Sequence, residues 1–182
     1  MKKLNINIGN LTHLPYGGLL LLSLIVVVMF FLCYVLLRNP YKGIHEQVFI
    51  TADKIRSYYR DQPGYWKLST QTAKDNNLIS PALLKHQKFD IQVGQGINGE
   101  AGTPGIGSFN IALSNLNKSS CISLAELKTD KQQLLALLRI AIVNQNGTTE
   151  FTWGADKPLP MTRQASREIC QPTGNTLVWT FQ

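Results

Sequence analysis

The sequence predicts an α+β fold in which a long N-terminal helix packs on an antiparallel β-sheet head. Three observations lead to this prediction: an uncharged apolar run over residues 17–37, an amphipathic pattern after it, and short alternating segments in the second half. A helix that is apolar on one face must bury that face against another layer of secondary structure. We expect that layer to be a sheet formed by the rest of the chain.

The apolar run has 21 residues, carries no charge and contains Ser23 as its only clearly polar side chain. A helix rises about 1.5 Å per residue, so such a run is long enough to cross a hydrocarbon core of roughly 30 Å. We therefore predict a transmembrane helix over residues 19–37. A cleaved secretory signal fits less well, because its apolar part spans about 7–15 residues and precedes a small-x-small site that this run lacks.

Two of the three cysteines, Cys121 and Cys170, lie in the second half of the chain, without CxxC or Cys/His metal spacing. Such a pair favours a disulfide in an oxidising compartment, with two unrelated free thiols as the alternative. Closing this loop would stabilise the head by very roughly 4 kcal/mol on the chain-entropy model. A disulfide would also place the head outside the cytoplasm, a question that the nearly balanced charges around the apolar run leave open.

The amphipathic pattern after the run predicts a helix from about residue 43 to residue 61. Ile44, Val48 and Ile55 recur near the helical period, and Pro63-Gly64 ends the pattern. A capping-box pattern, Ser123-x-x-Glu126, predicts the start of a further short helix.

Later segments alternate apolar and polar residues, as half-buried strands do. Asn146-Gly147 separates two of them and is a favoured hairpin turn, since both residues tolerate positive φ. The segments predicted as strands are 89–93, 108–113, 139–143, 148–153 and 176–181.

The residues offer little sign of catalysis. Gly94–Gly99 reads GxGxxG, but Pro104 and further glycines follow it, so no helix N-terminus would face a pyrophosphate and we expect a hairpin or surface loop. The three histidines are scattered and have no metal spacing. We therefore expect no enzyme activity, no cofactor and no nucleotide partner.

The net charge is +7 and is spread along the chain. Lys85, His86 and Lys88 form the densest basic patch, without interleaved aromatic residues or a nucleic-acid-binding motif. A phosphate-binding stripe needs clustered cations on one face. We expect a solvated cationic surface and no nucleic-acid partner.

Taken together, the chain resembles the type IV pilins, with the closest likeness to the type IVb branch and its minor or pilin-like members. The resemblance covers nearly the whole chain and is most specific over residues 107–116 leading to Cys121, and over 165–170 leading to the final strand. It implies that Cys121 and Cys170 bridge a C-terminal region that shapes the outer surface of a filament.

The resemblance also implies a leader over residues 1–18 that a prepilin peptidase removes after Gly18, which leaves Leu19 as the new N-terminus. Most pilins have a glutamate at the fifth mature position, where this chain has Ser23; cleavage after Gly17 would place Leu22 there. In the family this carboxylate is thought to pair with the terminal amine of a neighbour, and a buried ammonium without a partner costs several kcal/mol. The departure fits a minor pilin, an uncleaved pilin-like protein or a divergent major subunit.

Two functions follow as expectations. The first is a structural subunit of a type IV pilus or related filament, anchored in the bacterial inner membrane before assembly, with a periplasmic head over residues 38–182. Its partners would be other pilin subunits and the assembly machinery. The second is a bitopic inner-membrane component of a secretion or conjugation machine, whose head binds a partner protein. On either view, the loop over residues 94–107 and the region bounded by the disulfide are the surfaces expected to set specificity, since loops on a rigid scaffold commonly do so.

Overall fold

The computed structural model describes residues 22–31, 43–97, 104–126 and 136–182 of the chain. Its contacts divide the chain into two units, Met1–Pro40 and Tyr41–Gln182, which we describe separately. We call the second unit the head. The predicted leader, residues 1–18, lies outside the described residues, so its cleavage stays a prediction.

The prediction of a long N-terminal helix is wrong. The described helix of the first unit spans residues 22–31, and the next helix, α2, begins at Ile44. Ten residues rise about 15 Å, half of a hydrocarbon core, and in the part of the chain that the structure describes no helix is long and apolar enough to cross a membrane. An apolar run reports the environment that its side chains prefer, so the length of the run does not by itself fix the length of a helix.

The same finding contradicts the predicted inner-membrane location. That expectation depended on a single membrane-crossing helix over residues 19–37, and no described helix meets the requirement. The predicted antiparallel sheet with a helix packed on it is a separate expectation, and the head contains it.

Helix α2 (Ile44–Tyr59) confirms the predicted amphipathic helix. Its buried residues recur every three or four positions and include Val48, Ala52 and Ile55. Gly43 precedes the helix with φ 87°, a left-handed conformation that glycine adopts without strain. The periodicity thus fixed both the helix and the face that it buries.

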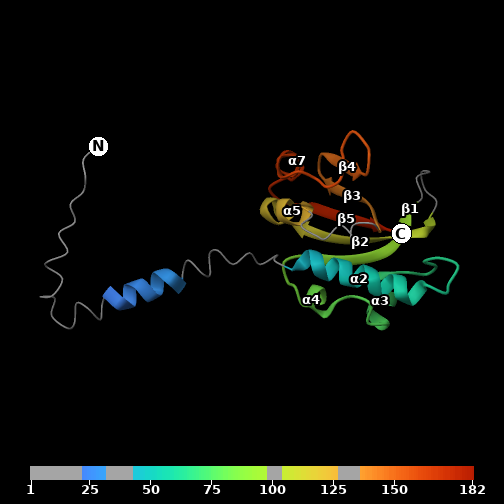
Figure 1. Ribbon diagram of the computed structural model, residues 1–182, viewed down its shortest axis with the longest axis horizontal. Helices are drawn as coiled ribbons and strands as arrows, with labels where there is room; N and C mark the ends of the chain where they lie inside the picture. The colour runs from blue at the N-terminus through green and yellow to red at the C-terminus, as the bar shows by residue number, and fades with distance from the viewer. Residues whose placement is uncertain (1–21, 32–42, 98–103, 127–135) are drawn as a thin grey trace, which may run out of the picture. The chain divides into compact units, whose positions relative to one another are not determined.

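The sheet has five antiparallel strands in the order β1-β2-β5-β3-β4 (Figure 1). Their bounds are β1 Asp90–Ile97, β2 Pro104–Leu116, β3 Leu137–Asn144, β4 Gly147–Thr152 and β5 Asn175–Phe181. The five predicted strands are confirmed. The last strand of the chain lies at the centre of the sheet, between two hairpins.

The turn of the β3–β4 hairpin differs from the expected Asn-Gly turn. Asn144 pairs with Gly147, so Gln145 and Asn146 are the central residues. Gly147 is the residue with positive φ, at 115°, and the Asn146 amide donates to Asn144 Oδ1 at 3.0 Å. Glycine after a two-residue turn lets the chain enter β4 without strain.

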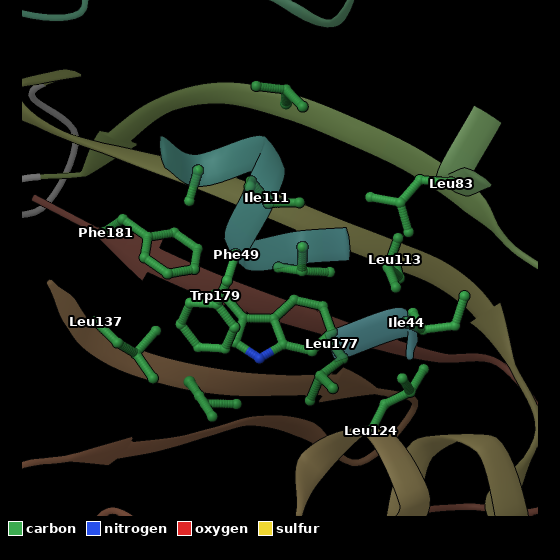
Figure 2. Packing of buried hydrophobic residues seen from close by; sticks show 14 of the residues in the cluster. Ile44, Phe49, Leu83, Ile111, Leu113, Leu124, Leu137, Leu177, Trp179 and Phe181 are labelled. Carbon is green, nitrogen blue, oxygen red and sulfur yellow. The ribbon is translucent and has the colours of Figure 1, made fainter. Parts of the chain in front are cut away.

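The core lies between α2 and one face of the sheet (Figure 2). Leu177, Trp179 and Phe181 of β5 all point into it and are fully buried, as their alternation predicted. The Phe49 ring of α2 meets Phe181 edge to face, with centroids 5.6 Å apart. Trp179 Nε1 is buried and has no hydrogen-bond partner among the described residues, so this ring stabilises the head by packing.

The described part of the head also contains four short helices: α3 Thr70–Asp75, α4 Pro81–Leu84, α5 Lys118–Ala125 and α7 Arg163–Ile169. The predicted capping box at Ser123 is wrong, because α5 begins at Lys118 with Asn117 as its N-cap. The Asn117 side chain accepts from the Ser120 amide at 2.9 Å. Asparagine is as good an N-cap as serine, and this one comes directly after β2.

Candidate partner-binding surfaces of the head

One end of the head is formed by α5, α7 and the turn that follows α7, and we call it the disulfide cap (residues 117–126 and 162–175). Cys121 of α5 and Cys170 after α7 are joined by a disulfide, with their Cα atoms 6.0 Å apart, and both are buried. The bond therefore lies beneath the cap rather than on its surface. Exposed side chains of α7, such as Arg167 and Glu168, form the outer surface of this cap.

Two asparagine side chains hold the disulfide cap in place as well. Asn175 is fully buried; its Nδ2 donates to the carbonyl oxygens of Leu116 at 2.9 Å and Gln171 at 2.8 Å, and its Oδ1 accepts from the Gln171 amide at 2.8 Å. Asn144 Nδ2 donates to the Ile169 carbonyl at 3.0 Å. Sequence reasoning missed both residues, because a lone asparagine at a strand end carries no motif.

The segment over residues 94–107 belongs to a β-hairpin, which confirms the expectation for the GxGxxG motif. Gly94 and Gly96 lie in β1. A Cβ atom added to Gly96 would lie 2.1 Å from Ser108 Oγ, so this glycine permits close approach of β1 and β2. Residues 98–103, which include the third glycine, lie outside the described residues.

A row of polar side chains crosses four strands on the sheet face opposite α2, and we call it the polar ladder. Arg139 of β3 donates from Nε to Thr180 Oγ1 at 3.0 Å and from NH1 to Glu150 Oε1 at 2.9 Å. Thr180 Oγ1 in turn donates to Asn110 Oδ1 at 2.7 Å. Arg139 and Glu150 belong to one hairpin, whereas Asn110 and Thr180 come from strands far apart in sequence that only the sheet order brings to it.

The aromatic residues near the end of α2 divide into two groups. Tyr59 is buried and its ring centroid lies 5.6 Å from that of Tyr65, which lies 4.6 Å from that of Phe109. Tyr59 is part of the hydrophobic core, and Tyr65 packs against it. Tyr58 and Trp66 are exposed instead.

Burial raises the pKa of both Tyr59 and Tyr65. For Tyr59 the neighbouring Tyr58 raises the pKa further, whereas for Tyr65 the guanidinium of Arg56 opposes the effect of burial. Both hydroxyls therefore keep their protons to a higher pH than an exposed tyrosine does.

The positions carried over from the pilin resemblance are only partly described. Gly18 and Leu19, the predicted cleavage site, lie outside the described residues. Ser23 lies in the first turn of the helix over residues 22–31 and is exposed. Along that helix every large apolar side chain is also exposed within the chain.

No three His, Cys, Asp or Glu side chains come together as metal ligands in the described ranges. The chain matches no protein-family model and no curated protein.

Proposed function

We propose that this protein is a structural subunit of a type IVb pilin-like filament and that its copies associate through the helix of residues 22–31. The observation that carries the proposal is the exposure of this helix: Leu22 and residues 24–31 expose 46–74% of their surface. A helix that is apolar on all sides belongs in an apolar interior. The same helix from other copies, packed side by side, supplies that interior.

Ser23 fits this arrangement better as a neutral group than as half of an ion pair. By the resemblance it occupies the place of the usual pilin glutamate, and a hydroxyl in an apolar bundle needs one hydrogen bond rather than a buried counter-charge. The proposal includes removal of the leader after Gly18 by a prepilin peptidase. In this proposal the head, closed by its disulfide, supplies the surface that meets partners.

The test compares two substitutions of the same type. Val27→Lys places a charge in the apolar helix, and Val143→Lys places one at a valine of β3 that is 37% exposed. We expect Val27→Lys to remove the protein from the sheared-filament fraction, since an unpaired ammonium in an apolar bundle costs several kcal/mol. The Val143→Lys variant should still assemble, and the heads of both variants should unfold at the same temperature as the head of the parental protein. N-terminal sequencing of the sheared protein should begin at Leu19.

Two results would contradict the proposal. Incorporation of Val27→Lys at the parental level would show that the helix is not the assembly element. Absence of the parental protein from sheared material, with the assembly machinery present, would favour the other function, a machine component whose head binds a partner protein without entering a filament.

A further inference from the structure

Helix α2 presents one face that the head leaves exposed. Its members follow one another at intervals of three or four residues: Glu46, Ile50, Asp53, Ser57 and the C-cap residue Arg60. Side chains with this spacing lie above one another on the same side of a helix. All five are exposed, and Ile50 exposes 37% of its surface. We call this face the α2 stripe.

Neighbouring parts of the head lie on both sides of the α2 stripe. On one side, the Ser80 amide donates to Thr51 Oγ1 at 3.0 Å, and Figure 1 shows α4 beside α2. On the other side, His45 Nε2 lies 2.6 Å from the Leu124 carbonyl oxygen. At 3.6 residues per turn, Thr51 and His45 fall on opposite sides of the stripe. The stripe itself therefore stays open to another molecule.

The charges of the α2 stripe are separated along its length. Glu46 lies in the first turn of α2, and Arg60 lies at its C-terminal end. Neither side chain takes part in an ion pair or hydrogen bond with another described residue. Asp53 lies midway between them and already pairs with Arg56, at 3.1 Å. The stripe thus has an acidic end, a paired centre and a basic end.

We propose that two copies of this chain pair through the α2 stripe, with their α2 helices antiparallel and a two-fold axis near Asp53. Glu46 and Arg60 are each seven residues from Asp53, so the reversed helix places Glu46 of each copy opposite Arg60 of the other. Ile50 and Ser57 are three and four residues from Asp53. Ile50 of one copy therefore meets Ser57 of the other, whose small side chain permits close approach.

The second copy fits because the stripe is complementary to itself only in this orientation. In a parallel pair in register, Glu46 would face Glu46 and Arg60 would face Arg60. A two-fold contact repeats each favourable interaction and is closed, so it does not propagate. These pairs are therefore a form of the protein outside any filament, and they do not depend on the helix of residues 22–31. One helix face buries less than the roughly 1,600 Å² of a standard interface, so we expect weak pairing.

Cross-linking of the purified full chain in detergent tests the orientation. The Cys33→Ser background leaves an introduced cysteine as the only thiol outside the disulfide. Asp53→Cys should form covalent dimers on mild oxidation, because each copy meets its own equivalent near the axis. Glu46→Cys alone should not, but a mixture of Glu46→Cys and Arg60→Cys should. Lys74→Cys, at an exposed position of α3, gives the background level.

Exchange of charges separates pairing from effects within one chain. An acidic first turn and a basic last turn also suit the dipole of α2 itself. Glu46→Arg and Arg60→Glu should each weaken pairing about tenfold in sedimentation equilibrium, since two exposed contacts become repulsive. The variant that carries both changes restores opposite charges across the interface and should pair like the parental protein. If the charges acted only through the dipole, this double variant would be the most impaired of the three.

Three results would overturn the proposal: Asp53→Cys dimers no more abundant than those of Lys74→Cys, equal cross-linking of Glu46→Cys alone, or a double charge variant that pairs as weakly as the single ones. The second result would indicate parallel helices. Val27→Lys should leave the Asp53→Cys cross-link in place. Loss of filament assembly and loss of this pairing are therefore separate outcomes.

Discussion

The helix over residues 22–31 and helix α2 are both rich in aliphatic side chains, yet of the two only α2 has a buried face among the described residues. In α2 the apolar residues recur at the helical period, and the side with Glu46 and Asp53 stays in solvent. In residues 22–31 they occur at nearly every position and are exposed on all sides. Pattern, rather than hydrophobicity, therefore distinguishes a helix that has one buried face from a helix that is exposed on all sides.

The strongest test of this comparison places the same charge in each helix. Ile55 of α2 is fully buried, so Ile55→Lys should unfold the head, because an unpaired ammonium in the core costs several kcal/mol and total stability is about 5–15 kcal/mol. Val27→Lys should leave head unfolding unchanged. Thermal unfolding followed by near-ultraviolet circular dichroism distinguishes the two. A folded head in Ile55→Lys would contradict the assignment of α2 as a core element.

A second test measures how much the packing of α2 against the disulfide cap depends on the bond between Cys121 and Cys170. The N-terminal turn of α2 meets the disulfide cap, where His45 Nε2 lies 2.6 Å from the Leu124 carbonyl oxygen. Removing the bond with Cys121→Ser/Cys170→Ser should destabilise the head by about 4 kcal/mol on the chain-entropy model. The amides of Asn175 and Asn144 remain, so we expect the head to stay folded at 25 °C. Denaturant unfolding measures the loss, with Cys33→Ser as the control.

An unchanged denaturant midpoint in Cys121→Ser/Cys170→Ser would show that the asparagine side chains hold the disulfide cap in place without the bond. Complete unfolding would show the reverse. Either result shows which interactions hold the N-terminal end of α2 in place. Neither result should alter the helix over residues 22–31, which belongs to the other unit.

Local patterns in the sequence were sufficient for much of the head. The period of Ile44, Val48 and Ile55 located α2, and the alternation of Leu177, Trp179 and Phe181 gave both β5 and its buried face. These signals are local, because each element carries its own apolar spacing. The length of the N-terminal helix could not be obtained this way, since uniform apolarity has no period that marks where a helix ends.

The candidate surfaces were harder to predict because they depend on long-range pairing. The polar ladder joins Asn110, Thr180, Arg139 and Glu150 through the order β2-β5-β3-β4, which no local spacing reveals. Asn175 acts through backbone groups of Leu116 and Gln171. In each case the residue type can be read from the sequence, but the group that it contacts cannot.

The smallest effect that we predict contrasts two adjacent residues at the end of α2, buried Tyr59 and exposed Tyr58. Burial raises the pKa of Tyr59 above the 10.0 of an exposed tyrosine. Below pH 10 both folded and unfolded chains keep the proton, so the full stability is present. Above it the unfolded chain loses the proton first, and stability falls as pH rises towards the folded pKa.

Tyr59→Phe should therefore reduce the loss of stability between about pH 9 and pH 11, measured by denaturant unfolding at each pH, because phenylalanine has no proton to lose. Tyr58→Phe is the matched comparison: it removes the neighbouring phenol, the smaller cause of the raised Tyr59 pKa, and leaves the larger cause, burial, so its profile should lie between those of Tyr59→Phe and the parental protein. If the three profiles run parallel, Tyr59 does not lose more solvent on folding than Tyr58, and the burial of this turn of α2 against Tyr65 is incorrect.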